Sequence, residues 1–177
     1  MPDSAPHPRG GATGATRAGI ERVVDAVGTA TAWISLVIVG LMAINVLARY
    51  LFSTGTVWSQ ELEWHLLVPL VLFGMSYALR HGDHVRVDIV YARFSERTKV
   101  AVDLVSALLT AAISVIVIWL SIKYVQQAYV IDEGSPDPGG IPHRYLIKSL
   151  IPIGFALLLA QSVASAIGAW EKLRRSS

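Results

Sequence analysis

The sequence predicts an all-α integral membrane protein with four transmembrane helices and with both termini on the cytoplasmic side. Four apolar runs contain no Asp, Glu, Lys or Arg, and they lie at 26–48, 64–79, 104–122 and 149–170. They are 23, 16, 19 and 22 residues long. Roughly 20 residues are needed to cross the hydrocarbon core of a bilayer. With 53% hydrophobic and 16% charged residues, the chain has more apolar surface than one soluble core can bury.

The distribution of basic residues sets the expected orientation. The two terminal segments and the 80–103 segment together hold 11 Lys and Arg, whereas 49–63 and 123–148 together hold 4. Cytoplasmic segments of membrane proteins carry the excess of Lys and Arg, so 49–63 and 123–148 are expected to face outward. A net charge of +2 is too small and too dispersed to indicate nucleic acid. The absence of cysteine excludes a disulfide framework, a thiolate nucleophile and a Cys-based metal site.

The first span follows a segment that is expected to be disordered. Residues 1–18 are rich in Gly, Ala, Pro, Ser and Thr and have too little apolar content to fold alone. They are predicted to form a cytoplasmic tail, and 19–177 a single membrane domain. The first helix is predicted at about 24–50. Its apolar run is longer than the h-region of a signal peptide and ends without a small-residue cleavage site, so we expect an uncleaved helix.

The second helix is predicted at about 59–80 and needs its flanks to span. Its apolar run, at about 1.5 Å per residue, covers only about 24 Å of a core near 30 Å. A helix that begins at Ser59, as an N-cap, gains a first turn with Glu61 and Glu63. Carboxylates there face the positive end of the helix. Trp58 would then mark the outer membrane interface.

The remaining two helices follow an amphipathic segment. Residues 80–103 alternate apolar and charged side chains and are predicted to form a connector on the cytoplasmic membrane face. Ser95 is a suitable N-cap for a third helix at about 96–125. Pro142 suits the first turn of a fourth helix at about 142–173. At about 48 Å that helix must tilt or project.

Small residues recur every four positions on the last two helices. Such stripes let helices approach closely in lipid. They serve either packing inside the four-helix unit or docking onto another membrane subunit, and the sequence leaves both open. The positions are Ser106, Thr110 and Ser114 on the third helix, and Ala156, Ala160, Ala164 and Gly168 on the fourth.

Several polar residues are candidates for specific contacts. Arg49 ends the first helix and lies across a short loop from Glu61, which suggests an interfacial ion pair. The alternative is a snorkelling Arg49 without a fixed partner. Oxygen and nitrogen ligands that could in principle bind zinc occur at His81, Asp83, His84 and Asp88, although a solvated loop that contacts a partner is the favoured interpretation. Two outer histidines that would permit a haem between the second and fourth helices are His65 and His143.

The membrane cores contain no carboxylate that could exchange a proton. Ionisable residues inside spans mark ion and proton pathways in transporters. The polar residues in the cores include Asn45, Ser114 and Gln161, which do not titrate. The sequence therefore disfavours an independent proton-coupled exporter.

Four sequence pieces resemble, in their order, the small membrane subunit (DctQ-like) of tripartite ATP-independent periplasmic (TRAP) transporters. The pieces are NVLARYLF, WSQELEW, LRHGDHVRVD and PGGIPHRYLIKSLIPIGFALLL, and the resemblance spans about residues 26–172. The motif positions that carry it are Arg49, Tyr50, Trp58, Glu61, His84, Val87 and Asp88.

The resemblance implies a non-catalytic small permease subunit in the bacterial inner membrane. It implies two protein partners, a large permease subunit and a periplasmic substrate-binding protein, in a sodium-gradient-driven importer of organic acids. Sodium is expected at the large subunit, with no cofactor, metal or catalytic residue in this chain. The small subunit would brace the large one and help to present a docking surface to the binding protein.

The interface and docking candidates follow from this resemblance and from their positions at the membrane edges. The interface or structural candidates are Arg49, Tyr50, Trp58, Glu61, Arg80, His84, Val87, Asp88, Arg144 and Lys148. The outer charged residues that could contact the binding protein are Glu61, Asp132, Glu133, Asp137, Arg144 and Lys148. Two alternative functions remain, a haem-binding membrane anchor of an electron-transfer enzyme and an independent small multidrug-type exporter.

Overall fold

The computed structural model describes residues 12–82 and 94–175. These residues form four α-helices, which are α1 (Ala12–Phe52), α2 (Val57–His81), α4 (Glu96–Val130) and α5 (Tyr145–Arg175). Each helix contains a stretch long and apolar enough to cross a membrane. The prediction of an all-α membrane protein with four spans is confirmed.

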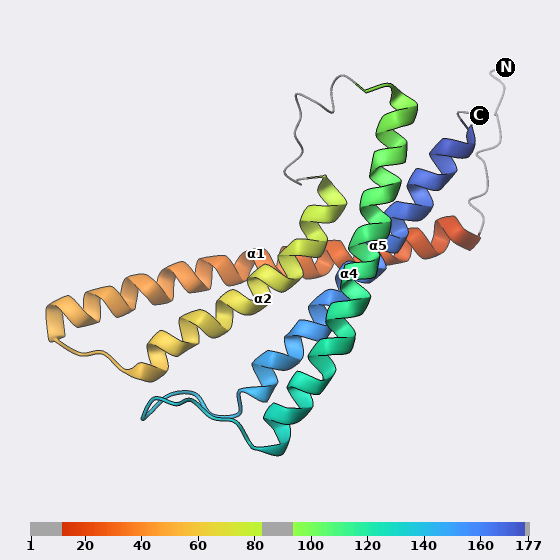
Figure 1. Cartoon of the computed structure of the whole chain (residues 1–177). Helices are drawn as coiled ribbons and strands as arrows, with labels where there is room; N and C mark the ends of the chain where they lie inside the picture. The colour runs from red at the N-terminus through yellow and green to blue at the C-terminus, as the bar shows by residue number, and fades with distance from the viewer. Residues whose placement is uncertain (1–11, 83–93, 176–177) are drawn as a thin grey trace.

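The helices form two antiparallel hairpins that are joined through α2 and α5 (Figure 1). The main contacts are between α4 and α5 and between α1 and α2, and α2 then packs on α5, with a smaller contact from α1. The beginning of α1 and the end of α5 lie at one end of the bundle, and the loops 53–56 and 131–144 lie at the other. We call this loop end the outer end, because both loops are predicted to face outward.

Helix α1 begins at Ala12, well before the predicted start at 24. Residues 12–18 are therefore helical rather than part of a disordered tail, while residues 1–11 lie outside the described part of the chain. An ion pair between Arg17 and Glu21 at 2.8 Å supports this extension, because side chains four residues apart share a helix face. With 41 residues, α1 is about 62 Å long and must tilt or project from the membrane.

Helix α2 confirms that the second span borrows length from its flanks. Its 25 residues give about 38 Å, which exceeds the hydrocarbon core. The N-cap is Thr56 rather than the expected Ser59, and the Thr56 side chain accepts a hydrogen bond from the Ser59 backbone N–H at 3.2 Å. The helix ends at His81 and is capped by Gly82, which has φ 76°, a left-handed conformation that glycine adopts without strain.

Helices α4 and α5 agree with the prediction except at three of their ends. Ser95 is the N-cap of α4, as predicted, and its hydroxyl accepts from the Thr98 backbone N–H at 3.2 Å. Helix α4 continues to Val130, five residues beyond the predicted end, and α5 to Arg175 rather than 173. Helix α5 begins at Tyr145 rather than at 142, because His143 has φ 59° and cannot continue a right-handed helix. The predicted amphipathic connector falls largely on 83–93, outside the described residues.

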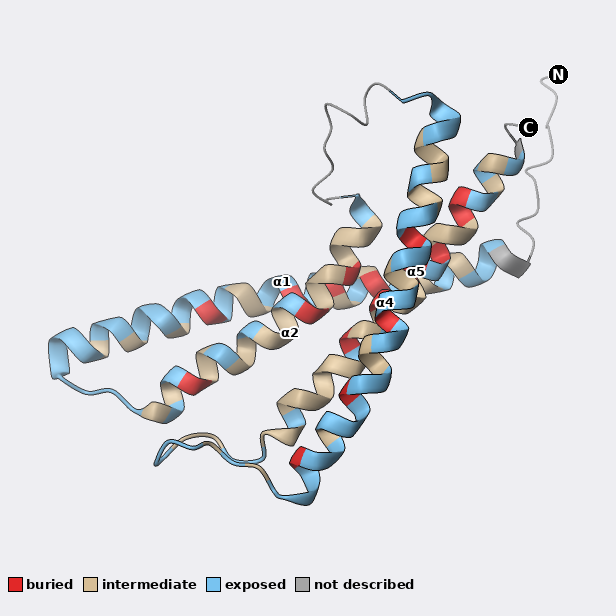
Figure 2. Cartoon of the chain, in the orientation of Figure 1, coloured by how far each residue is buried: buried red, intermediate tan, exposed pale blue. Residues whose placement is uncertain are grey.

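The contact between α4 and α5 repeats every seven residues. The buried positions of α4 are Ala107, Ser114, Ser121 and Ala128, and the buried residues lie at intervals along the helix in Figure 2. A seven-residue repeat keeps one face of a helix against its neighbour. A four-residue step instead advances by about 40° around the axis, so a four-residue stripe soon leaves the contact face.

The predicted four-residue stripes therefore describe this contact only in part. Ser114 lies in the seam, but Ser106 is exposed and Thr110 is half-buried. On α5 the four stripe residues are placed unequally, with Ala164 and Gly168 buried, Ala160 half-buried and Ala156 exposed. Gly168 lies against Arg17 of α1.

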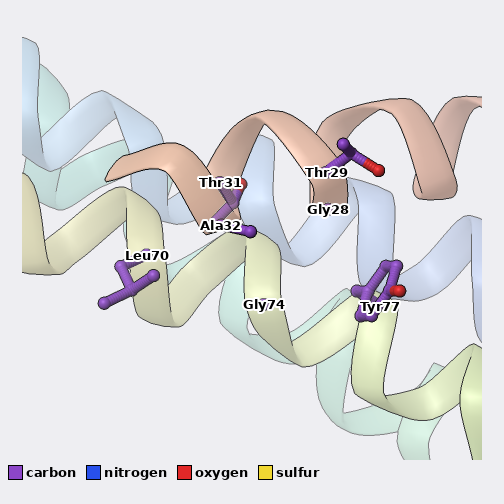
Figure 3. A pocket seen from close by; sticks show the side chains of 7 residues that line it. All are labelled: Gly28, Thr29, Thr31, Ala32, Leu70, Gly74 and Tyr77. Carbon is purple, nitrogen blue, oxygen red and sulfur yellow. The ribbon is translucent and has the colours of Figure 1, made fainter. Parts of the chain in front are cut away.

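Two glycines allow close approach between helices elsewhere in the bundle. At Gly154 of α5, a Cβ atom would lie 2.7 Å from the Leu72 Cβ of α2 and 3.4 Å from its carbonyl carbon. At Gly28 of α1, a Cβ atom would lie 2.6 Å from the Cγ atom of the Tyr77 ring. A groove of about 410 Å³ runs beside this second contact (Figure 3), and it is lined by Gly28, Thr29, Thr31, Ala32, Leu70, Gly74 and Tyr77.

Candidate functional site

Glu61 of α2 lies at the centre of a polar network at the outer end. Its side chain is held on three sides, although it stands only one turn inside the start of α2. The Ser135 hydroxyl donates to the Oε1 atom of the carboxylate, and the Ile141 backbone N–H donates to the Oε2 atom at 2.6 Å. The Arg144 guanidinium lies 3.4 Å from the same carboxylate. Glu61 is only 7% exposed, so the loop covers it almost completely.

The expected ion pair between Arg49 and Glu61 is wrong. Glu61 pairs instead with Arg144, which belongs to the loop before α5, while Arg49 lies exposed near the end of α1. Donors from the loop occupy the carboxylate oxygens, so the carboxylate is already satisfied without Arg49. The alternative interpretation of Arg49 as a snorkelling anchor stays a prediction.

Gly140 makes the close fit between the loop and Glu61 possible. A Cβ atom at this position would lie 2.7 Å from the Glu61 Oε2 atom and would also collide with the Ser135 side chain. Such separations are shorter than van der Waals contact, so any larger residue would push the loop away from α2. The glycine is therefore needed for space rather than for conformational freedom.

The two ends of the loop are tied to each other where they leave α4 and enter α5. Asp132 and His143 both have left-handed backbone conformations, with φ 45° and 59°. For residues other than glycine this conformation costs about 1 kcal/mol each. The His143 Nδ1 and Asp132 Oδ1 atoms are 2.9 Å apart, and the Arg144 backbone N–H donates to the Glu133 carbonyl at 2.7 Å. These contacts hold the base of the loop closed.

Lys148 and Asn45 extend the polar contacts to the other three helices. The Lys148 ammonium group pairs with Glu133 and lies 4.0 Å from the centre of the Tyr124 ring of α4, a favourable cation–π geometry. On the other side, the Asn45 amide of α1 donates to the Glu63 carboxylate of α2 at 2.6 Å. All four helices therefore take part in polar contacts at the outer end.

A smaller polar cluster joins α1 and α2 at the inner end. Arg80 pairs with Asp25 at 2.8 Å, and the His81 Nε2 atom lies 3.8 Å from the same carboxylate. The interface candidate Arg80 therefore has a partner within this chain.

Most of the zinc-ligand candidates lie outside the described residues. His81 is the exception. The candidates outside, as zinc ligands or as interface residues, are Asp83, His84, Val87 and Asp88. No group of three potential metal ligands occurs among the residues that the structure describes.

The remaining candidates divide into exposed and engaged side chains. Tyr50 and Trp58 are 83% and 49% exposed, so both are open to lipid or to a partner subunit. Five of the six outer charged candidates have a side-chain partner within the chain, namely Glu61, Asp132, Glu133, Arg144 and Lys148. The sixth, Asp137, is exposed.

Sequence reasoning missed the residues that cover Glu61. The Pro- and Gly-rich segment was expected to be an irregular outer loop, but nothing in the local sequence indicates that Ser135, Gly140 and Ile141 reach α2.

The two histidines proposed as haem ligands have other partners at Nδ1. His65 bonds to the Glu61 carbonyl at 2.7 Å, and His143 to Asp132.

Residues 38–172 match the family described as tripartite ATP-independent periplasmic transporters, DctQ component. One curated relative is the ectoine TRAP transporter small permease protein TeaB of Halomonas elongata, 27% identical over 124 residues, which cover 70% of this chain and 63% of the relative. Another is the C4-dicarboxylate TRAP transporter small permease protein DctQ of Rhodobacter capsulatus, 28% identical over 133 residues, or 73% of this chain and 58% of the relative. The chain thus matches about 60% of the length of these relatives.

Proposed function

This chain belongs to the DctQ-component family of TRAP transporters, and from this we propose that it braces a large permease subunit in a sodium-gradient-driven importer. The observation that carries the proposal is the family match over residues 38–172, which includes the last third of α1, all of α2 and α4, and most of α5. The four membrane spans agree with a small permease protein of the bacterial inner membrane.

The contacts of this chain support a bracing role. The outer ends of the helices are linked through Glu61 and Lys148, and the inner ends of α1 and α2 through Asp25 and Arg80. The four apolar runs contain no Asp, Glu, Lys or Arg, so their cores offer no carboxylate for ion coupling. We therefore assign sodium and substrate binding to the large subunit, and no catalytic role to this chain.

The substrate class is inferred from the names of the relatives. One relative is named for ectoine and the other for C4-dicarboxylates. We propose organic acids as the cargo of the assembled importer, delivered by a periplasmic substrate-binding protein.

The first expected result is that this chain is retained with a larger membrane protein and transports nothing by itself. An affinity-tagged chain should co-purify with a large permease subunit from its native membrane. Proteoliposomes should take up a labelled organic acid only when both subunits, the binding protein and an inward sodium gradient are present. Uptake by the small chain alone would contradict the proposal. A Soret band that disappears in His65→Ala would instead support the haem-anchor alternative.

We further propose that the outer loop helps to dock the binding protein through its exposed carboxylates. The Asp132 side chain is 71% exposed although it contacts His143, and Asp137 is exposed near the middle of the loop sequence. The basic residues nearby, Arg144 and Lys148, are already paired with Glu61 and Glu133. The loop surface is therefore acidic, and a basic surface of the binding protein would complement it.

Asp137→Lys is expected to weaken this docking, because it reverses a charge without touching the contacts of Glu61. The concentration of loaded binding protein that gives half-maximal uptake should rise, most clearly at low ionic strength, where charge contacts are least screened. The maximal rate should stay the same. Glu96→Lys is the control, because Glu96 is an exposed carboxylate at the inner end, 87% exposed. An unchanged half-maximal concentration at every ionic strength would exclude Asp137 from the docking surface.

A further inference from the structure

We propose that loop 131–144 is a strap that fixes the outer ends of the two hairpins relative to each other, with Glu61 as its fastening point. The loop joins α4 to α5, two neighbouring helices of one hairpin, with 14 residues between Val130 and Tyr145. Connections between antiparallel helices usually need only about 2–8 residues. Figure 1 shows what the extra length does, because the loop reaches sideways to the beginning of α2, in the other hairpin.

The fastening is specific to one carboxylate. Ser135 and Ile141, from two places in the strap, bond to the two oxygens of Glu61. Glu61 is 7% exposed, and a buried carboxylate is stable only when such donors satisfy it. If the strap moved away, Glu61 would lose these donors and would face the lipid headgroups uncovered. The contact therefore stabilises both the strap and the start of α2.

The strap is shaped to point toward α2. Left-handed conformations at Asp132 and His143 turn the chain at both ends of the strap, and the Asp132–His143 contact joins those ends. The Asp137 backbone N–H donates to the Ser135 hydroxyl, and the Gly140 backbone N–H donates to the Asp137 carbonyl. The strap is thus folded by its own contacts, and Ser135 is held ready for Glu61.

The strap acts at a distance from a close contact between the hairpins. Helices α2 and α5 pack closely at Leu72 and Gly154. Glu61 precedes Leu72 by 11 residues, which is about 16 Å along a helix. Without the strap, the outer turns of α2 could pivot about the contact between Leu72 and Gly154. The strap closes this end of the interface.

The test measures distances between the hairpins by electron paramagnetic resonance on the full chain in lipid nanodiscs. The chain contains no cysteine, so two introduced cysteines define each spin-label pair. Gln60→Cys with Gln126→Cys reports on the outer end, and Thr29→Cys with Val102→Cys on the inner end, all four sites being exposed. Gly140→Val should shift the outer distances upward and broaden their distribution, while the inner distribution stays unchanged.

A matched substitution in the same strap is the control. Gly134 has open space around it, so Gly134→Val should leave both distributions unchanged. Glu61→Ala removes the fastening point without adding bulk and should broaden the outer distribution as Gly140→Val does. Glu61→Gln keeps one acceptor oxygen and should broaden it less.

Three outcomes would contradict the proposal. One is an unchanged outer distance distribution in both Gly140→Val and Glu61→Ala, and another is that Gly134→Val broadens the outer distribution as much as Gly140→Val does. The third is that Glu61→Ala broadens the inner distribution as much as the outer one, which would mean that Glu61 stabilises the whole bundle. The measurement uses this chain alone, so it does not depend on whether the chain co-purifies with a large permease subunit.

Discussion

Gly154→Ala is expected to destabilise the four-helix unit by about 1–3 kcal/mol, a typical cost of overpacking a close contact. The added Cβ atom would lie 2.7 Å from the Leu72 Cβ, which cannot rotate away because it is bonded directly to the backbone. Helices α2 and α5 would have to separate, and their contact is the largest between the hairpins. The midpoint of unfolding in mixed micelles of mild detergent and dodecyl sulfate should fall.

The same substitution at Gly74 should have the opposite effect on stability. Gly74 lies two residues after Leu72 on α2, and a Cβ atom there would meet nothing within 4 Å. Gly74→Ala should therefore stabilise the helix by about 0.5–1 kcal/mol, the usual difference between Gly and Ala inside a helix. If Gly154→Ala were as stable as the parent chain, the close approach of α2 and α5 would not be a tight contact.

Glu61→Ala is expected to lower the thermal stability of the chain and to reduce uptake by the assembled transporter. The substitution leaves the Ser135 hydroxyl, the Ile141 N–H and the Arg144 guanidinium without their acceptor. Unpaired polar groups at the membrane edge are costly, and a charged group more so than a neutral one. The midpoint of thermal unfolding, followed in detergent, should fall further for Glu61→Ala than for Glu61→Gln.

A double-mutant cycle with Arg144 isolates the ionic part of this effect. Because Arg144→Ala removes the cation that Glu61→Ala would leave unpaired, the double variant should lose less stability than the sum of the two single variants. Glu96→Ala is the control for removal of a carboxylate, since Glu96 is 87% exposed and pairs with Lys99. Strictly additive losses in the cycle would show that Glu61 and Arg144 do not interact.

The features that the sequence predicts well are those that depend on neighbouring residues. Apolar runs identify four spans, and a serine before a polar first turn identifies the N-cap Ser95. The early start of α1 was missed, because Gly and Pro near residues 8–14 indicate disorder while the Arg17–Glu21 pair stabilises a helix a few residues later.

The features that the sequence does not predict depend on distant residues. Glu61 is bonded to residues 74 and 80 positions later in the chain, and a sequence offers no sign of which distant donor will reach it. Arg49, the nearest cation across the first loop, was the natural choice and is wrong. The predicted four-residue stripes describe the α4–α5 contact only in part for a geometric reason, since this contact uses a seven-residue repeat on α4 and four-residue spacing drifts off the face.

The distance in sequence between Glu61 and its strap also sets an order of events during synthesis. At roughly 5–20 residues per second, the ribosome needs about 4–16 s to add the 80 residues that separate Glu61 from Ile141. The first hairpin is therefore synthesised before the residues that cover its carboxylate. The contact between the strap and Glu61 forms only after α4 has been synthesised, so it makes the outer end of the first hairpin depend on completion of the second.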